Sequence, residues 1–158
     1  MKPTFLFLAA LLACAPFADA QTMSYGTPIT ADTAKKIAAP AIAEARKNQW
    51  TMAIAIVDTA GELVYFERMD DTQVGSVDVA ISKARSAARF KRPTKAFQDA
   101  LAAGGEGLRI LALNGAIPVD GGLPLVVGGR IVGAIGASGG TSAQDGQVAA
   151  AGAAALGK

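Results

Sequence analysis

LPLVVGGRIVGAIGASGGTSAQDGQV, residues 123–148, has the pattern of a strand, a tight turn, a second strand and the start of a helix. The two strand segments are rich in Val, Leu and Ile, and Gly128-Gly129 supplies the positive φ angles that a two-residue hairpin turn requires. Thr141 and Gln144 have the spacing of a capping box, which predicts a helix that continues to about Leu156. The segment therefore predicts an antiparallel hairpin followed directly by a helix.

A second hairpin is predicted by IAIVDTAGELVYFERMDD, residues 54–71, in which Thr59-Ala60-Gly61 separates two strand-like runs. The first run, residues 51–57, is apolar on both of its faces, so both faces must be covered. The cover comes either from helices of the same chain or from another subunit. This strand, together with helices of small residues that favour close packing, predicts a homo-oligomer.

Helical patterns flank the two hairpins. A helix capped by Thr30 or Asp32 is predicted up to Asn48, with a kink or a break at Pro40, which lacks a backbone donor. Two further helices are predicted over residues 76–90, capped by Ser76, and over residues 94–102. Residues 108–113 fit a helical turn and a strand equally well.

The order of these elements is α, β, β, α, α, β, β, α, with the strands in hairpins. This order predicts the α+β class, an antiparallel sheet with helices packed on it. Residues 21–29 are predicted to be an extended arm, and residues 30–158 one domain.

Residues 1–20 have the pattern of a signal peptide. Lys2 precedes an apolar stretch, Thr4–Ala15, which is too short to span a bilayer comfortably as a helix. Ala18-Asp19-Ala20 has the small-x-small pattern that signal peptidases accept. We therefore expect cleavage before Gln21 and a periplasmic or secreted protein, with no membrane span. A second route stays open, because residues 11–14 resemble a lipobox in which Cys14 carries the lipid of a lipoprotein.

The composition excludes much of the common catalytic chemistry. The chain has 158 residues, no histidine and a single cysteine, Cys14, and its formal net charge is +2. A Ser-His-Asp triad, a Cys-His dyad and imidazole metal ligands are therefore excluded. The low net charge and the lack of a row of aromatic residues argue against nucleic acid as a partner. A small-ligand binder is favoured over an enzyme.

Residues 79–98 form a local basic run, with six basic residues and no carboxylate. One interpretation is a solvated helix face whose charges complement the helix dipole. The other is an anion site in which arginine side chains hold carboxylates. The basic residues of the run are Lys83, Arg85, Arg89, Lys91, Arg92 and Lys95.

Further charged residues are expected to meet at one end of the sheet. Arg68, Asp70 and Asp71 end the first hairpin, and Asp120 precedes the second. Carboxylates there could bind ferric iron or act as acid and base. Aspartates are also common turn formers, and both interpretations stay open.

Three blocks of sequence occur in a specific order and spacing: residues 54–71, ISKARSAARFKRPT at residues 81–94, and residues 117–156 with VDGG and GAIGASGG. In this combination the chain resembles the GlcG/HbpS-like family over nearly all of its length after residue 20. The resemblance implies a profilin-like sheet of about five antiparallel strands, in a ring-like or octameric assembly. It also implies binding of haem or its breakdown, with a role in iron or redox sensing. Relatives include the C-terminal domain of the PduO-type corrinoid adenosyltransferase and proteins encoded beside glycolate oxidation genes.

Some relatives ligate haem iron through a histidine, whereas this chain has none. Haem iron here would therefore need another protein ligand. The resemblance places Ser86 where another relative has a hydroxyl near haem. Several tyrosines and methionines could serve chemically as iron ligands, but they also fit ordinary core or strand positions. They are Tyr25, Tyr65, Met23, Met52 and Met69.

The sequence thus predicts a protein that binds haem or a related tetrapyrrole without histidine ligation, in haem or iron handling or sensing. The predicted contacts are Lys83, Ser86, Arg89, Arg92 and Arg68, with Asp70, Asp71 and Asp120 as candidate metal ligands. The alternative is an enzyme or carrier that acts on a small organic carboxylate held by the same arginines. A sensor or transport partner is expected in the first case.

Overall fold

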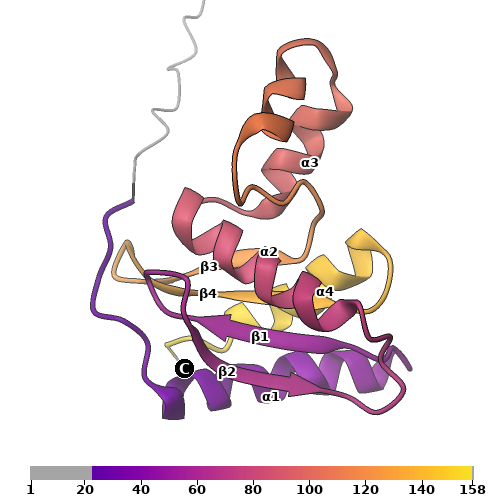
Figure 1. Cartoon of the computed structure of the whole chain (residues 1–158). Coiled ribbons are helices and arrows are strands. Elements are labelled where there is room, and N and C mark those ends of the chain that lie inside the picture. The colour runs from indigo at the N-terminus through magenta and orange to yellow at the C-terminus, as the bar shows by residue number, and fades with distance from the viewer. Residues whose placement is uncertain (1–22, 158) are drawn as a thin grey trace, which may run out of the picture.

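Four antiparallel strands form the sheet, in the order β2-β1-β4-β3 (Figure 1). The structure is a computed structural model that describes residues 23–157. The strands are β1 (Ala53–Val57), β2 (Leu63–Arg68), β3 (Gly122–Val127) and β4 (Arg130–Ser138). Both predicted hairpins and the α+β class are confirmed, but the sheet has four strands instead of about five.

The helices are α1 (Ala31–Lys47), α2 (Ser76–Phe90), α3 (Thr94–Ala102) and α4 (Ser142–Ala153), and a 3-10 helix, η1, spans Gly105–Ala112. α1 runs through Pro40 without the predicted break, because buried residues on both sides of it, such as Ala38 and Ala41, pack into the same core. Gly75 precedes α2 in place of the predicted cap Ser76. The capping box of Thr141 and Gln144 is confirmed.

β1 is buried over its whole length, and its two faces are covered by different helices. Met52, Ile54 and Ile56 pack in a core with residues of α1 and α4. The other face of β1 packs against the alanines of α2. Helices of the same chain therefore cover both faces, and the sheet no longer supports the prediction of a homo-oligomer.

The predicted arm lies along the part of β4 that extends past β1. The amide of Ile131 donates to the carbonyl of Ser24 (2.9 Å), and the amides of Gly26 and Ile29 donate to Ile131 and Val132 (both 2.8 Å). The arm thus lies beside β4 on the side of β1, not at an outer edge of the sheet, and Tyr25 forms an isolated parallel bridge with Ile131. The predicted signal peptide, residues 1–20, lies outside the described residues.

Residues 94–119, which we call the lobe, comprise α3, η1 and the loop that returns to β3. Figure 1 shows the lobe standing away from the sheet. In α3 and η1 only Thr94, Phe97 and Ile110 are buried. Phe97 meets Phe90 of α2 edge-on, with 5.3 Å between the ring centres, and Thr94 accepts a hydrogen bond from the amide of Gly122. Across residues 23–157 no helix has the length and apolar character needed to cross a membrane.

Candidate functional site

The polar groups gather at one end of the sheet, where β1 and β3 begin and β2 and β4 end. The strand register places Ala53 beside both Arg68 and Ser138, and Gly122 beside Gly136. We call this the polar end. The two hairpin turns lie at the opposite end, so the loops that carry Asp70, Asp120 and Gly140 share one end, as the sequence predicted.

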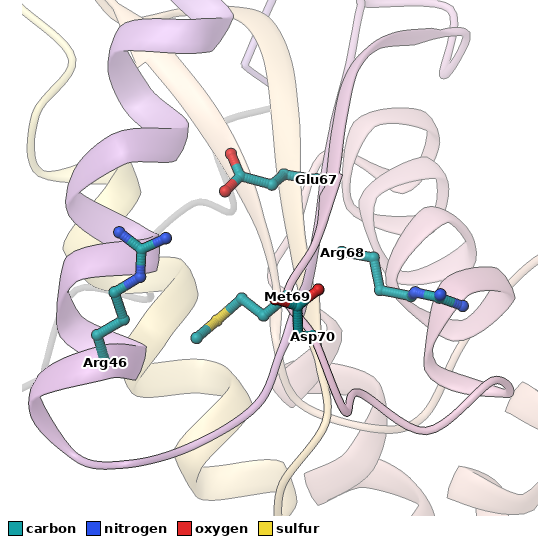
Figure 2. A pocket seen from close by; sticks show the side chains of 5 residues that line it. All are labelled: Arg46, Glu67, Arg68, Met69 and Asp70. Carbon is teal, nitrogen blue, oxygen red and sulfur yellow. The ribbon is translucent and has the colours of Figure 1, made fainter.

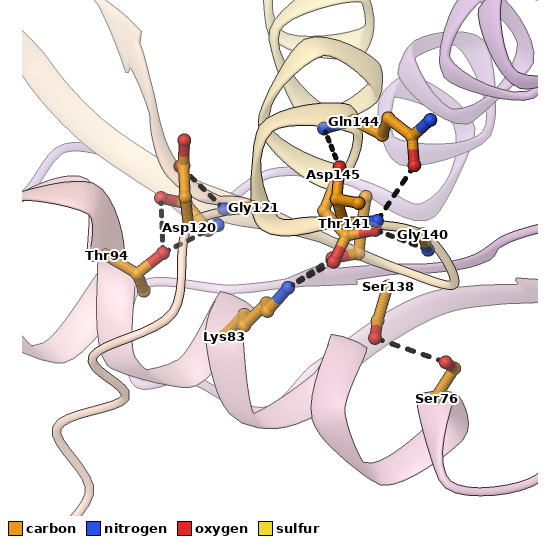
Figure 3. Close-up of polar contacts among 12 residues, drawn as sticks. Ser76, Lys83, Thr94, Asp120, Gly121, Ser138, Gly140, Thr141, Gln144 and Asp145 are labelled. Atoms are coloured by element: carbon orange, nitrogen blue, oxygen red, sulfur yellow. Dashed lines mark hydrogen bonds and ion pairs between the residues drawn. The ribbon is translucent and has the colours of Figure 1, made fainter. Parts of the chain in front are cut away.

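A buried ion pair lies at the polar end. Lys83 Nζ of α2 lies 2.6 Å from Asp145 Oδ2 of α4 and donates to the carbonyl of Ala137 (3.2 Å) (Figure 3). The Lys83 side chain is completely buried, so it cannot contact an anion at the surface. The burial of Lys83 argues against it as a contact to haem. Lys83 belongs to the basic run in the sequence, but its side chain turns toward the sheet, whereas Arg85 and Arg89 of the same helix stay exposed.

Glycines enclose this ion pair. A Cβ on Gly121 would lie 2.9 Å from Lys83 Nζ and 2.8 Å from Asp145 Cβ, so any larger residue would displace the pair. The amide of Gly122 donates to Thr94 Oγ1 (2.9 Å), and the amide of Gly140 donates to Asp145 Oδ1 (3.0 Å). The VDGG and SGG segments are therefore structural loops that cover the pair.

Burial raises the pKa of the Asp145 carboxyl, and the hydrogen bonds from Lys83 and the Gly140 amide oppose this shift. Neither charged group reaches solvent to meet a substrate, since the Lys83 and Asp145 side chains are 0% and 4% exposed. The pair holds α2, β4 and α4 together and supplies no accessible acid, base or nucleophile.

Buried hydroxyls extend the polar end toward the start of α2. Ser138 Oγ lies 3.2 Å from Ser76 Oγ, and Gln73 Nε2 donates to Ser76 (2.9 Å). Thr72 Oγ1 is also buried and has no hydrogen-bond partner among the described residues. Thr72 belongs to the loop between Arg68 and Ser76.

The basic run is not unopposed, because carboxylates from other segments meet it. Arg89 NH2 lies 3.1 Å from Glu62 Oε1 and its Nε donates to the carbonyl of Ala60 (2.8 Å). Arg85 donates to the carbonyl of Gly61 (3.0 Å), and Lys95 pairs with Asp99 (2.6 Å). Two arginines of the run thus hold the turn between β1 and β2, which the sequence did not reveal.

Two neighbouring cations of the run, Lys91 and Arg92, contact aromatic rings. Lys91 Nζ lies 4.4 Å from the centre of the Tyr25 ring, and Arg92 lies over the ring of Phe97 at 5.5 Å. Arg92 is exposed. Among the haem contacts predicted in this run, Arg92 has no carboxylate partner within residues 23–157, and it remains accessible to a ligand.

Ser86 is fully buried, and its Oγ accepts a hydrogen bond from the amide of Ile117 (3.1 Å). The hydroxyl therefore anchors the loop that returns from the lobe. A ligand could reach this hydroxyl only if that loop moved.

An open pocket of about 370 Å³ lies where α1 passes the end of β2. Its walls are Arg46, Glu67, Arg68, Met69 and Asp70. Figure 2 shows the Met69 thioether on the side of α1, with Arg46 across from it, whereas the Arg68 guanidinium points to the other side of β2. The pocket thus combines a soft sulfur ligand with the cation of Arg46 and the carboxylates of Glu67 and Asp70.

Tyr65 lies on the strand beside this pocket. Its hydroxyl donates to Glu67 Oε2 (2.8 Å), and this hydrogen bond is the main cause that raises the pKa of Tyr65. The phenol is therefore held in its neutral form, which is the weaker iron ligand. Of the other candidates, Met52 is in the core, and the Tyr25 hydroxyl donates to the carbonyl of Ala88 (2.9 Å).

The candidate metal ligands do not come together. Among residues 23–157, no three His, Cys, Asp or Glu side chains form a group that could hold a metal ion. Asp120 accepts from the amide of Gly121 (2.7 Å) and lies against Gly146 of α4, whereas Asp70 lines the pocket and Asp71 has a left-handed φ of 61° in the turn. The turn-forming role predicted for aspartates accounts for Asp71.

Sequence reasoning missed two residues of this end of the molecule. Asp145 carried no signal beyond its place in the first turn of a helix, where acidic residues are common. Arg46 was one of several charged residues near a helix end. Only the tertiary arrangement brings Asp145 to Lys83 and Arg46 to Met69.

The comparisons with known proteins agree with this fold. A family model described as "Haem degrading protein HbpS-like" matches residues 29–154. Protein GlcG of Escherichia coli strain K12 is 39% identical over 95 residues, which are 60% of this chain and 69% of GlcG.

Two solved structures are similar. A double mutant of HbpS from Streptomyces reticuli superposes with a TM-score of 0.77 and 29% identity, covering 99% of this chain and 100% of that one. A PduOC:heme complex superposes with a TM-score of 0.74 and 26% identity, covering 83% of this chain and 96% of that one. The resemblance noted from the sequence is thereby confirmed, and the match over residues 29–154 shows that this chain belongs to the HbpS-like family.

Proposed function

We propose that this protein binds haem or a closely related tetrapyrrole. The observation that carries the proposal is the family match over residues 29–154. The PduOC:heme complex, similar along 83% of this chain, supports it. The family thus supplies the ligand class, and the side chains of this chain decide where such a ligand fits.

The pocket at the end of β2 fits this ligand class best among the described residues. Met69 offers a thioether, which is an established axial ligand of haem iron. Arg46 lies across the pocket from it and is exposed, so its guanidinium is free to bind a propionate. Arg68 lines the pocket as well, but its guanidinium points to the other side of β2. Met69 and Arg46 would therefore hold the ligand, with no histidine needed.

We further propose that the protein works outside the cytoplasm, in haem or iron handling. The support is the signal-peptide pattern of residues 1–20, with Gln21 as the first residue of the mature protein and lipidated Cys14 as the alternative start. Intact mass of the exported protein separates the two starts. A diacylated Cys14 at the N-terminus would contradict soluble export.

Titration of the purified protein with hemin, followed at the Soret band, tests the ligand. We expect a saturable change with one haem per chain. Met69→Leu should shift the Soret maximum and weaken binding, and Arg46→Gln should weaken it by about 1.5 to 3 kcal/mol, the range for hydrogen bonds to charged groups. Arg130→Gln, an exposed arginine at the hairpin end, is the matched control and should leave binding unchanged.

The absence of a saturable Soret change with excess hemin would contradict the proposal. The alternative is then a small organic carboxylate bound by Arg46, which calorimetric titration with short hydroxy acids would detect. If hemin binds with equal affinity to wild type and to both pocket variants, the ligand class stands and the pocket is the wrong site.

A further inference from the structure

Asn114 and Gly115 lie in a tight turn of the lobe, where the chain returns from η1 toward β3. The carbonyl of Leu113 accepts a hydrogen bond from the amide of Ala116 (3.1 Å), and Gly115 has a φ of 86°. A positive φ at the third residue of the turn alone is the pattern of a type II turn, which favours glycine at that place. The residue after Asn114 therefore has the least hindered backbone nitrogen that a protein can offer.

Both central residues of this turn are open to solvent. Asn114 and Gly115 are exposed, and a Cβ on Gly115 would meet no atom within 4 Å. The Gly115 amide donates to no backbone carbonyl within residues 23–157. Water and base can therefore reach this nitrogen, and no packing holds it away from the side chain of Asn114.

The chain has one other asparagine, Asn48, and its surroundings differ. The side-chain amide of Asn48 donates to the carbonyl of Glu44 (2.8 Å) and to Glu44 Oε1 (2.9 Å). The next residue is Gln49, whose amide donates to the carbonyl of Arg46 (3.1 Å). Asn48 is thus fixed by hydrogen bonds and followed by a residue with a side chain, so it is an internal control in the same protein.

We propose that Asn114 and Gly115 form a self-modification site. Base removes the proton of the Gly115 amide, and the nitrogen attacks Cγ of Asn114. A bond between this nitrogen and Cγ forms, the bond from Cγ to Nδ2 breaks, and ammonia leaves with a proton. The product is a five-membered succinimide, and water then opens the ring at either of its carbonyls to give aspartate or isoaspartate. Water is the co-reactant, and nothing is oxidised or reduced.

Conversion changes the loop in two ways. Either product adds one negative charge to a chain whose formal net charge is +2. Isoaspartate also inserts a methylene group into the backbone shortly before Ile117, whose amide donates to Ser86 Oγ (3.1 Å). The longer backbone no longer fits the turn, so the contact with Ser86 weakens and the loop loosens. The site lies outside the pocket at the end of β2 and does not depend on the proposed haem function.

Peptide mass spectrometry of the purified full chain, aged at mildly alkaline pH, tests the proposal. Trypsin cleaves after Arg109 and Arg130 and releases residues 110–130, in which Asn114 is the only asparagine. This peptide should gain the mass difference between an amide and an acid, in two products that chromatography separates. The peptide that begins at Asn48 should stay unchanged, and Asn114→Gln should abolish the conversion. A sample digested without ageing controls for conversion during the digest.

A synthetic peptide of residues 110–130 separates the effect of the fold from that of the sequence. The folded chain should convert no more than about tenfold more slowly than the peptide, because exposed loops open at almost no cost in free energy. A folded chain in which Asn114 stays intact while the peptide converts would overturn the proposal. Equal conversion at Asn48 and Asn114 would overturn it as well.

Hydrogen exchange at the Ile117 amide tests the consequence for the loop. Exchange should be faster in the aged wild type than in freshly prepared Asn114→Asp, which has the added charge without the longer backbone. Fresh wild type and fresh Asn114→Asp should exchange alike. Equal exchange in the aged wild type and in Asn114→Asp would contradict the loosening of the loop. Thermal melts of all samples show that the rest of the fold is intact.

Discussion

Lys83 Nζ and Asp145 Oδ2 lie 2.6 Å apart in an interior that excludes both side chains from solvent. The lysine comes from the middle of α2 and the aspartate from the first turn of α4. Since the lysine also donates to Ala137 on β4, three elements meet at this one contact. A buried pair of this kind is sensitive to the loss of either partner.

Lys83→Met should lower the free energy of unfolding by about 3 to 5 kcal/mol, because Asp145 is left buried without its counter-charge. Urea denaturation followed by circular dichroism measures the loss. The double variant Lys83→Met with Asp145→Asn should recover part of it, since no uncompensated charge remains. A single variant within about 1 kcal/mol of wild type, the size of a surface substitution, would show that the pair is not buried in solution.

The stability of the protein should depend on the protonation of Asp145. Its pKa is raised above the ordinary value of 3.8 by burial, so the folded state binds this proton more tightly than the unfolded state does. The stabilisation that protonated Asp145 contributes is then fully present below pH 3.8. It is lost as the pH rises through the pKa of Asp145 in the folded state. The difference in unfolding free energy between wild type and Asp145→Asn should therefore fall as the pH rises across this range. A difference that grows with pH would contradict the direction of the shift.

Gly136→Ala should be strongly destabilising, by about 1 to 3 kcal/mol or more, as expected for overpacking. A Cβ at this position would collide with the carbonyl of Ala80 and lie 2.7 Å from the amide nitrogen of Ala84, so α2 would have to move away from β4. Gly75→Ala is the matched control, because its Cβ would meet nothing within 4 Å. Thermal melts compare the two variants, and equal melting temperatures would refute the close approach of α2 to β4.

Ser86→Ala should affect stability and leave haem affinity unchanged. The substitution removes the acceptor of the Ile117 amide, and an unsatisfied amide costs about 1 to 3 kcal/mol. Ser82→Ala on the same helix is the control, since Ser82 is less buried. Melting temperature and Soret titration are measured on the same samples. Loss of haem binding at unchanged stability would place the ligand at Ser86 instead of the pocket.

The hairpins and helices could be predicted because they depend on local rules. Gly128-Gly129 has the left-handed φ angles that its turn needs, 55° and 74°, and Thr141 with Gln144 forms the predicted cap. Where tertiary contacts decide, local rules fail: α1 continues through Pro40 because its neighbours are held in the core.

The candidate site was harder to predict, because its chemistry depends on residues far apart in the chain. The run from residue 79 to residue 98 contains no carboxylate, yet Asp145 pairs with Lys83, and Glu62 pairs with both Arg85 and Arg89. A helix face that is basic in sequence can thus be half buried and neutralised. Met69 was a candidate ligand, but its neighbour Arg46 comes from α1, more than one element earlier in the chain, and could not be assigned to it.

The arm along β4 bears on the order in which the protein matures. Ser24 and Gly26 leave the ribosome long before their partner Ile131. β1 likewise waits for β4, its central neighbour. Contacts between segments far apart in the sequence form slowly, because a long loop must close first. The sheet therefore stays incomplete until β4 has been synthesised.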